Sequence, residues 1–222
     1  MIKKLTIVFF LLVSVHFSMN AQTSDQSKQL LEQSSTKNNG YKTIKADFKF
    51  STSNLQNDKK INETGKIAIK GDNYHLSLSN TEIIFDGKAV YTYLKEANEV
   101  NITKPEPSKK DNGVFFFSNP HDVFKIYSKD FKSKLIQETT IGSLPCYEID
   151  LYPIDLKTKY SRIRMHIAKT NLQILDLKIF QKDGTLYLLE FTSFITNSDI
   201  SETEFTFDSK KYPKAEINDM RF

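Results

Sequence analysis

Hydrophobic and polar residues alternate along most of this chain with the period of two that is typical of β-strands, most clearly from Thr81 to Ile102. Two runs rich in Ile, Phe, Val, Tyr and Thr flank Asp86-Gly87, a pair that favours a two-residue type I′ turn. A polar block at residues 95–98 predicts a second turn before a third strand, Glu99 to Thr103. The alternation puts Ile83, Phe85, Val90 and Leu94 on one face, and Ile84, Tyr91 and Tyr93 on the other. Both faces must therefore be covered, or one must hold a ligand.

The same pattern predicts strands on both sides of this meander. Before it, strands are expected at Tyr41 to Thr52, Gly65 to Lys70 and Tyr74 to Ser79, with a polar loop from Asn54 to Lys60. After it, strands are expected at Phe131 to Glu138, Pro145 to Tyr152, Ser161 to Ile167, Leu172 to Phe180, Thr185 to Thr196 and Glu202 to Phe207. The short turns leave no room for helical crossovers, so the sheet is antiparallel. We expect one all-β domain of about eleven strands that curls without closing.

Two segments predict helices. Ser24 to Asn39 has a thin apolar stripe with Leu30 and Leu31, and Gly40 occupies the usual place of a helix C-cap. A polar, proline-containing stretch from Lys104 to Asn112 interrupts the sheet, and an aromatic run and a short helix beginning at Asn119-Pro120 follow it. We expect these segments to form a lid, with Leu30, Leu31, Phe115, Phe116, Phe117, Val123, Phe124 and Tyr127 as its apolar residues.

The N-terminus predicts export. Lys3-Lys4 precede an apolar stretch, Leu5 to Val15, that is too short to span a bilayer, and Ala21 is a suitable cleavage residue. We therefore expect residues 1–21 to be a signal peptide and residues 22–222 to form one soluble, monomeric periplasmic domain; a retained membrane anchor is the alternative. Cys146 is the single cysteine, which excludes an internal disulfide and a cysteine metal cluster.

Catalytic and metal-binding patterns are missing from the sequence. The 31 basic and 27 acidic residues are scattered, which argues against nucleic-acid binding. His75, His121 and His166 fall on different elements without a zinc spacing, and no nucleophile-elbow or phosphate-loop motif occurs. We expect no enzyme activity, no metal and no cofactor. We also expect His166 and the pairs Glu148/Asp150 and Glu202/Glu204 to be solvated, and Cys146 to be half-buried.

The aromatic content indicates a function more strongly than any catalytic motif does, because 17 Phe and 10 Tyr side chains must all be shielded from water. If the lid packs completely, these side chains are only core; if it is loosely seated, they line a pocket for an apolar ligand. The sequence does not show which face of the meander is concave, so the predicted cavity draws on both faces. Its residues are Phe48, Phe50, Ile67, Ile69, Tyr74, Leu76, Ile83, Phe85, Tyr91, Tyr93, Val100, Ile163, Met165, Leu177, Ile179, Leu189 and Phe191.

Several segments together resemble the LolA family of periplasmic lipoprotein carriers. They are YKTIKADFKF, GKIAIKGDNYHL, IIFDGKAVYTY and NEVNI, then NPHDVFKIY, SRIRMHI with ILDLKIFQKDG, and AEINDMRF, which span essentially the whole mature chain. The resemblance implies an incomplete antiparallel β-barrel with a helical lid, whose cavity takes the acyl chains of lipoproteins. It also implies partners: acylated lipoproteins, an inner-membrane lipoprotein-releasing ABC transporter and an outer-membrane acceptor.

In one position the chain departs from this family, where an arginine usually fastens the lid helices. Lys70 stands at the matching position, which implies a weaker or differently built latch, because an ammonium group cannot form a planar bidentate fork. The short tail also implies that the family's final hook strand is missing or reduced. Two other functions stay open: the same cradle for another lipid or apolar ligand, and an envelope-stress sensor of lipids or lipoproteins.

Overall fold

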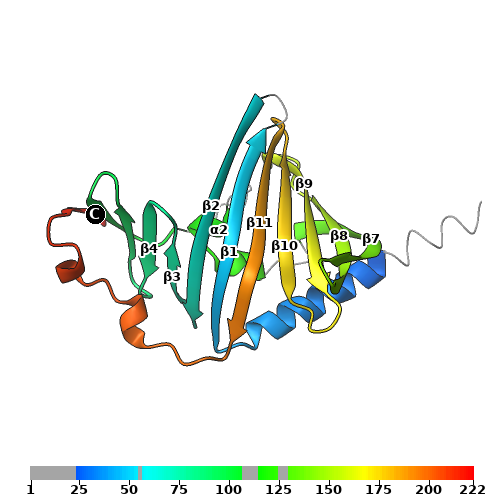
Figure 1. The fold of residues 1–222 in the computed structure, drawn as a ribbon, viewed down its shortest axis with the longest axis horizontal. Helices are drawn as coiled ribbons and strands as arrows, with labels where there is room; N and C mark the ends of the chain where they lie inside the picture. The colour runs from blue at the N-terminus through cyan, green and yellow to red at the C-terminus, as the bar shows by residue number, and fades with distance from the viewer. Residues whose placement is uncertain (1–23, 55–56, 107–114, 125–129) are drawn as a thin grey trace, which may run out of the picture.

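The computed structural model describes residues 24–54, 57–106, 115–124 and 130–222. The predicted signal peptide, residues 1–21, lies outside the described residues. The dominant element is one twelve-stranded sheet with the order β12-β6-β5-β4-β3-β2-β1-β11-β10-β9-β8-β7 (Figure 1). Its two end strands, β7 and β12, do not pair with each other, so the sheet stays open. This architecture confirms the predicted all-β, half-open barrel.

The strands follow the chain as an antiparallel meander in two blocks. The first block contains β1 (Thr43–Asn54), β2 (Asn57–Lys70), β3 (Asn73–Ser77), β4 (Thr81–Phe85), β5 (Val90–Leu94) and β6 (Glu99–Thr103). The second block contains β7 (Phe131–Ile141), β8 (Leu144–Pro153), β9 (Tyr160–Ala168), β10 (Ile174–Gln181) and β11 (Thr185–Thr196). Pairing of β11 with β1 joins the blocks, and places Phe191 opposite Phe48 in the middle of the sheet.

Two of the predicted turns differ from the structure. The hairpin between β4 and β5 closes through a four-residue loop, because the Asp86 carboxylate accepts hydrogen bonds from the backbone N–H groups of Lys88 and Ala89. The loop is two residues longer than predicted, so the assignment of side chains to the two faces is unchanged. The polar loop predicted from Asn54 to Lys60 is wrong, because β2 begins at Asn57, directly opposite Asn54.

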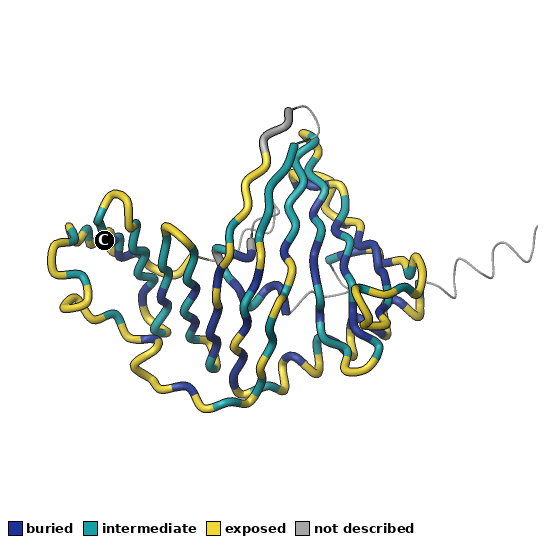
Figure 2. Tube along the Cα trace, in the orientation of Figure 1, coloured by how far each residue is buried: buried dark blue, intermediate teal, exposed yellow. Residues whose placement is uncertain are grey.

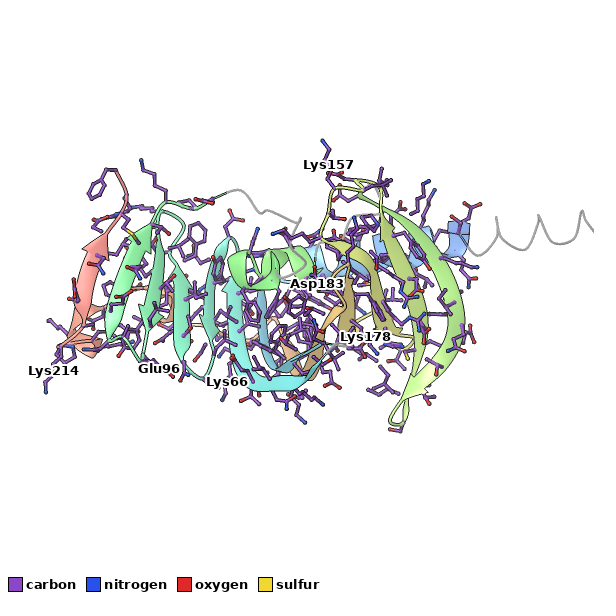
Figure 3. All side chains as sticks on the ribbon, turned by 90° about the horizontal axis from the view of Figure 1, so that it is seen from above. Lys66, Glu96, Lys157, Lys178, Asp183 and Lys214 are labelled. Carbon is purple, nitrogen blue, oxygen red and sulfur yellow. The ribbon has the colours of Figure 1, made fainter. Side chains whose placement is uncertain are left out.

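One face of the sheet carries the helices. The N-terminal helix covers residues 24–39, and the short helices α2 (Phe115–Ser118) and α3 (His121–Phe124) lie on the same side (Figures 1 and 3). Their apolar residues, including Leu31, Phe116 and Val123, pack with those of β1–β3 and β7–β11 into the main hydrophobic core. This concave face is therefore the covered face of the half-barrel.

The opposite face carries the C-terminal segment, which we call the strap (residues 197–215). It crosses the back of the sheet and contains the 3-10 helices η2 (Glu202–Phe205) and η3 (Ser209–Lys211) (Figure 1). The strand predicted from Glu202 to Phe207 is wrong, because the Ser201 side chain caps η2 by accepting from the Thr203 N–H. The strap leads into β12 (Glu216–Asp219), which pairs in parallel with β6, so the predicted antiparallel arrangement does not hold for this last strand. A short final strand thus completes the sheet.

Two small clusters hold the strap. Ile200 and Phe205 bury against Ala68 of β2. Further along, Phe207 and Tyr212 pack against Tyr91, Tyr93, Ala89, Val100 and Ile102 in a group that we call the tail cluster. Burial is dense at the centre of the long strands and sparse at the tips, as Figure 2 shows. In the part of the chain that the structure describes, no helix has the length and apolar character that crossing a membrane requires.

Candidate functional site

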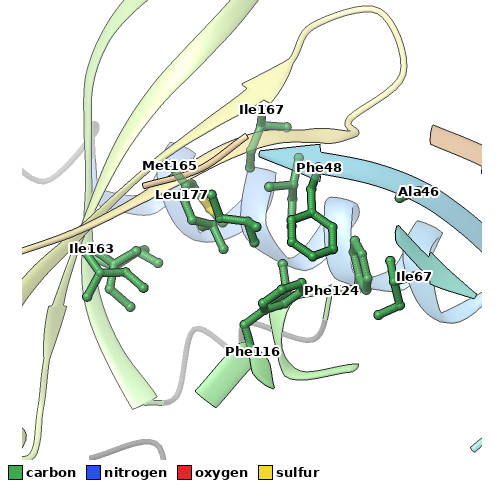
Figure 4. Packing of buried hydrophobic residues seen from close by; sticks show 14 of the residues in the cluster. Ala46, Phe48, Ile67, Phe116, Phe124, Ile163, Met165, Ile167 and Leu177 are labelled. Carbon is green, nitrogen blue, oxygen red and sulfur yellow. The ribbon is translucent and has the colours of Figure 1, made fainter. Parts of the chain in front are cut away.

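Aromatic rings join the lid helices to the concave face. The Phe48 ring of β1 lies edge-on to the Phe116 ring of α2 (Figure 4), with 5.0 Å between centroids. Phe50 meets Phe117 in the same way at 4.8 Å. Phe124 of α3 contacts Phe191 of β11 at 5.5 Å. Such pairs stabilise contacts by about 0.5–1.5 kcal/mol each beyond burial. The lid is therefore seated on the sheet through apolar surface.

A close approach of the backbone makes room for this packing. Gly65 of β2 lies opposite Phe48, and a Cβ atom at that position would stand 2.2 Å from the end of the Phe48 ring. The glycine therefore lets the ring lie flat over β2 and reach Phe116. The sequence pattern alone did not indicate this role of Gly65.

Most of the predicted cavity residues come together on the concave face. The main core buries Phe48, Ile67, Ile69, Tyr74, Leu76, Ile163, Met165, Leu177, Ile179 and Leu189, and Phe50, Ile83, Phe85 and Phe191 pack against it partly buried. Burial raises the pKa of the Tyr74 hydroxyl to about 12, so this side chain stays neutral.

Three predicted cavity residues do not belong there. Tyr91, Tyr93 and Val100 lie in the tail cluster on the opposite face, beneath the strap. The physical reason is the pleat: the register of β4, β5 and β6 puts these side chains on the face opposite to Ile83 and Phe85. The strap thus covers the back of the meander, and the cavity prediction is corrected for these three positions.

The predicted lid residues divide in a similar manner. Leu30, Leu31, Phe116, Val123 and Phe124 are buried in the main core, and Phe117 packs against it partly buried. Phe115 begins α2, but its side chain, like the whole of Tyr127, lies outside the described part of the chain.

Polar contacts tie the helices down at a few points. The His121 Nε2–H of α3 donates to the Asp72 carbonyl oxygen at the β2–β3 turn, over 3.1 Å. On the N-terminal helix, the Ser27 and Ser133 hydroxyls meet at 2.8 Å, and the Ser34 hydroxyl donates to the Leu172 carbonyl oxygen.

The predicted lid latch is wrong. The Lys70 ammonium donates to the Ile200 carbonyl oxygen over 3.0 Å and pairs with Glu202 over 2.6 Å, and both residues belong to the strap. Its neighbour Ile69 points into the main core, so the alternation of β2 directs Lys70 to the back of the sheet. Lys70 therefore fastens the strap, and the described lid helices are held by other contacts.

An open pocket continues the concave face beyond the lid. It has a volume of about 480 Å³ and lies between α3, the β2–β3 turn, the β4–β5 loop and the end of β6. Tyr74, Phe85 and Val90 form its apolar wall, and Asp72, Asn73, Glu106, Asn119, His121 and Asp122 line its polar side. We call it the vestibule. It combines apolar and polar lining at the margin of the lid, which is the arrangement that an amphiphilic ligand requires.

Sequence reasoning missed a buried ionic cluster on the back of β8–β10. Asp150, which is 1% exposed, accepts hydrogen bonds from Arg164 Nε at 2.7 Å and Arg162 Nη1 at 3.2 Å. Arg164 also lies 2.9 Å from Glu148, which is buried as well. The prediction that Glu148 and Asp150 are solvated is wrong, because arginines on the neighbouring strand cover them.

His166 belongs to the same cluster. Its Nδ1 lies 2.7 Å from Asp176 and its Nε2 lies 3.3 Å from Glu148. The hydrogen bond to Asp176 raises the pKa of His166, and with a smaller contribution from Glu148 it outweighs the opposing effect of burial. The arrangement is an ion-pair network facing away from the core, so we assign it to stability, and the prediction of a solvated His166 is wrong.

Among the described residues, the remaining candidates for catalysis or metal binding are not arranged for either role. Cys146 is fully buried, not half-buried as predicted, and burial raises the pKa of its thiol, which disfavours the nucleophilic thiolate. Within the described ranges no group of three or more His, Cys, Asp or Glu side chains is arranged to hold a metal ion.

Comparison with known proteins agrees with this fold. A family model described as an uncharacterized protein matches residues 78–200, more than half of the chain. No curated protein matches the chain. Among solved structures, an uncharacterized conserved protein from Thermus thermophilus is similar with a TM-score of 0.58 and 9% identity, over 87% of this chain and 99% of that one.

Two further solved structures carry descriptive names. A candidate outer membrane lipoprotein-sorting protein domain from Vibrio parahaemolyticus has a TM-score of 0.48 and 10% identity, over 86% of this chain and 100% of that one. A LolA superfamily protein from Nitrosomonas europaea has a TM-score of 0.41 and 11% identity, over 82% of this chain and 98% of that one.

Proposed function

We propose that this chain, whose segments resemble the LolA family, is a carrier that takes up acyl chains between its lid and the concave face of its sheet. The observation that carries this proposal is the composition of that interface: Phe116, Val123 and Phe124 of two one-turn helices pack onto an aromatic and aliphatic sheet surface. Helices of four residues are not stable alone, so the contacts with the sheet hold them in place.

An interface of this kind can exchange one apolar surface for another. Burying an acyl chain contributes about 0.8 kcal/mol per CH₂ group. Three chains in a closed cavity would therefore be held almost irreversibly unless a free-energy cost opposed their binding. In this protein, loading would first expose the rings of Phe48, Phe116 and Phe124, and the acyl chains would then cover them. The cost of exposing these rings offsets part of the gain, so that uptake and release both remain feasible.

The proposal also specifies which molecule the protein carries and in which compartment it acts. We propose that the cargo is the acylated N-terminus of lipoproteins, carried through the periplasm from an inner-membrane ABC transporter to an outer-membrane acceptor. Residues 1–21 would act as the signal peptide that exports the chain, and residues 22–222 as the carrier domain. A binding role, not catalysis, is what the aromatic interface supports.

Locking the lid tests the proposal. Asp72 and His121 are in contact across the lid margin, so we would place cysteines at both positions in a Cys146→Ala background and join them with a short reducible bis-methanethiosulfonate linker. Native mass spectrometry would then measure uptake of a triacylated cysteine lipopeptide. We expect the linked protein to take up at least tenfold less lipopeptide than the unlinked one, because the lid can no longer leave the concave face.

Reduction of the linker is the internal control. Cleaving it with dithiothreitol should restore uptake in the same sample, which separates locking from damage by the substitutions. Equal uptake by linked and reduced protein would overturn the proposal. Uptake of a free phospholipid but not of the lipopeptide would instead support the second function of this cradle, the carriage of another lipid.

A further inference from the structure

The vestibule contains a buried carboxylate that lacks a partner. Asp122 of α3 is 9% exposed, and its Oδ2 atom is buried without a hydrogen-bond partner among the described residues. Asp122 lines the vestibule together with His121 and Asn119. A buried carboxylate oxygen without a donor is costly, and native proteins leave few such atoms unpaired. No described residue satisfies this oxygen, so the geometry leaves it able to accept a hydrogen bond from a bound group.

The charged residues around Asp122 indicate whether the group that donates this hydrogen bond is a cation or an anion. Asp72 adds a second carboxylate to the vestibule lining. The lysine on its rim, Lys70, pairs with Glu202 of the strap on the back of the sheet. His121 is engaged through Nε2 with the Asp72 carbonyl oxygen. The polar side of the vestibule thus favours a cation.

The opposite wall of the vestibule is apolar. Tyr74 and Phe85 pack against each other with 5.5 Å between ring centroids, and Val90 lines the same pocket. This wall is continuous with the main core, because Tyr74 is buried in it and Phe85 packs against it. A ligand in the vestibule can therefore place an acyl chain toward the concave face and a polar group toward Asp122.

We propose that the vestibule binds the ammonium group of an acylated amphiphile, with Asp122 as its principal acceptor. This inference rests on the proposed carrier function and specifies the cargo that the cradle prefers. A primary ammonium group carries three N–H donors and can satisfy Oδ2 with a charge-assisted hydrogen bond. A trimethylammonium group has the same charge but no donor, so it would leave Oδ2 unpaired.

Two chemical sources supply such a group, and the experiment separates them. One is the ethanolamine headgroup of a phospholipid; the other is a lysine close to the acylated cysteine of a lipopeptide. The first pair of probes is dioleoyl phosphatidylethanolamine and dioleoyl phosphatidylcholine, which differ only in the groups on nitrogen, three N–H donors in the first and three methyl groups in the second. The second pair is a triacylated Cys-Ser-Lys peptide and its Cys-Ser-Gln counterpart.

Competition for the full mature chain, read by native mass spectrometry, measures the preference within each pair. We expect the wild-type protein to favour the ammonium-bearing member of at least one pair by about tenfold, the equivalent of 1.4 kcal/mol. Asp122→Asn should reduce that preference to about one while still binding both members. Asp199→Asn, which removes a carboxylate from an exposed strap position outside the vestibule, should keep the full preference.

The outcomes separate this inference from the proposed function. Binding of both members of each pair with equal affinity by the wild-type protein would overturn the ammonium site and leave the carrier function intact. Binding of no acylated probe would overturn the carrier function itself. If Asp122→Asn fails to fold, the wild-type preference for ethanolamine over choline still decides the question, because that comparison needs no variant.

Discussion

At the scale of single residues, the ionic cluster on β8–β10 shows how a polar pattern can be buried. Alternation along β8 and β9 puts Glu148, Asp150, Arg164 and His166 on the back of the sheet, as predicted. The sequence could not show that Arg164 and Asp150 stand opposite each other in the register, because pairing between strands is a property of the fold. The same pattern on an unpaired strand would be solvated.

His166 gives this cluster a defined pH dependence. Its folded pKa is raised, chiefly by the Asp176 hydrogen bond, so the folded state binds a proton more tightly than the unfolded state. The stabilising contribution is therefore complete below the unfolded value of about 6.5 and is lost as the pH rises through the raised folded pKa.

We expect His166→Gln to lower the free energy of unfolding by about 1.5–3 kcal/mol at pH 5.5, the range for hydrogen bonds to charged groups. The difference from wild type should shrink as the pH rises toward 9. Urea unfolding at several pH values measures it, with Lys157→Gln, at an exposed position outside this cluster, as the control. A difference that grows with pH would contradict the assigned protonation of His166.

At the scale of elements, the strap is what the sequence pattern described least well. Val100, Tyr91 and Tyr93 were recognised as needing cover, but their cover comes from Phe207 and Tyr212, more than one hundred residues later. Glu202 to Phe207 alternates like a strand, yet Ser201 caps it as η2 and no neighbouring edge is available to pair with it. Local periodicity cannot decide between these outcomes.

The contacts of Lys70 lead to a prediction that separates strap from lid. Lys70→Ala removes the bonds to Ile200 and Glu202. Because this pair is largely exposed, we expect a loss of less than about 1 kcal/mol in global stability. Amide hydrogen exchange should accelerate in residues 197–205, while that of α2 and α3 stays unchanged.

Phe116→Ala is the matched variant for the lid, since Phe116 packs on Phe48 and has no contact with the strap among the ring contacts described. It should accelerate exchange in α2 and α3 and leave residues 197–205 as they are. Faster exchange of the lid helices in Lys70→Ala would restore Lys70 as the lid latch and contradict our assignment.

At the scale of the whole molecule, the sheet has two unequal parts. The strands β1–β3 and β7–β11 enclose the main core with the helices and β4 packs against it, whereas β5, β6 and β12 extend beyond the lid as a wing (Figures 1 and 3). The sequence predicted β1–β11 and their antiparallel order, but not β12, which pairs in parallel with β6. It could not predict which face curls inward, because apolar residues occupy both faces of the meander and only the positions of lid and strap distinguish them.

This asymmetry predicts that the wing opens before the rest of the sheet. Its strands β5 and β6 have five residues each and β12 has four, while β1, β2 and β11 have 12, 14 and 12. On its back, β5 is fastened to the strap by the Tyr91–Phe207 stack, with 4.8 Å between ring centroids and 12° between planes. Segments with fewer buried contacts exchange through smaller openings.

We therefore expect Phe207→Ala to accelerate amide exchange in β5, β6 and β12 by about tenfold, since an aromatic pair contributes about 0.5–1.5 kcal/mol beyond its burial. Exchange in β8 and β9 should not change, because the main core does not include Phe207. Phe222→Ala, at a fully exposed terminal ring, is the control and should have no effect. Equal acceleration across all strands would mean that the sheet opens as a single unit. In that case the wing could not part from the lid to admit an acyl chain at the vestibule while the core stays folded.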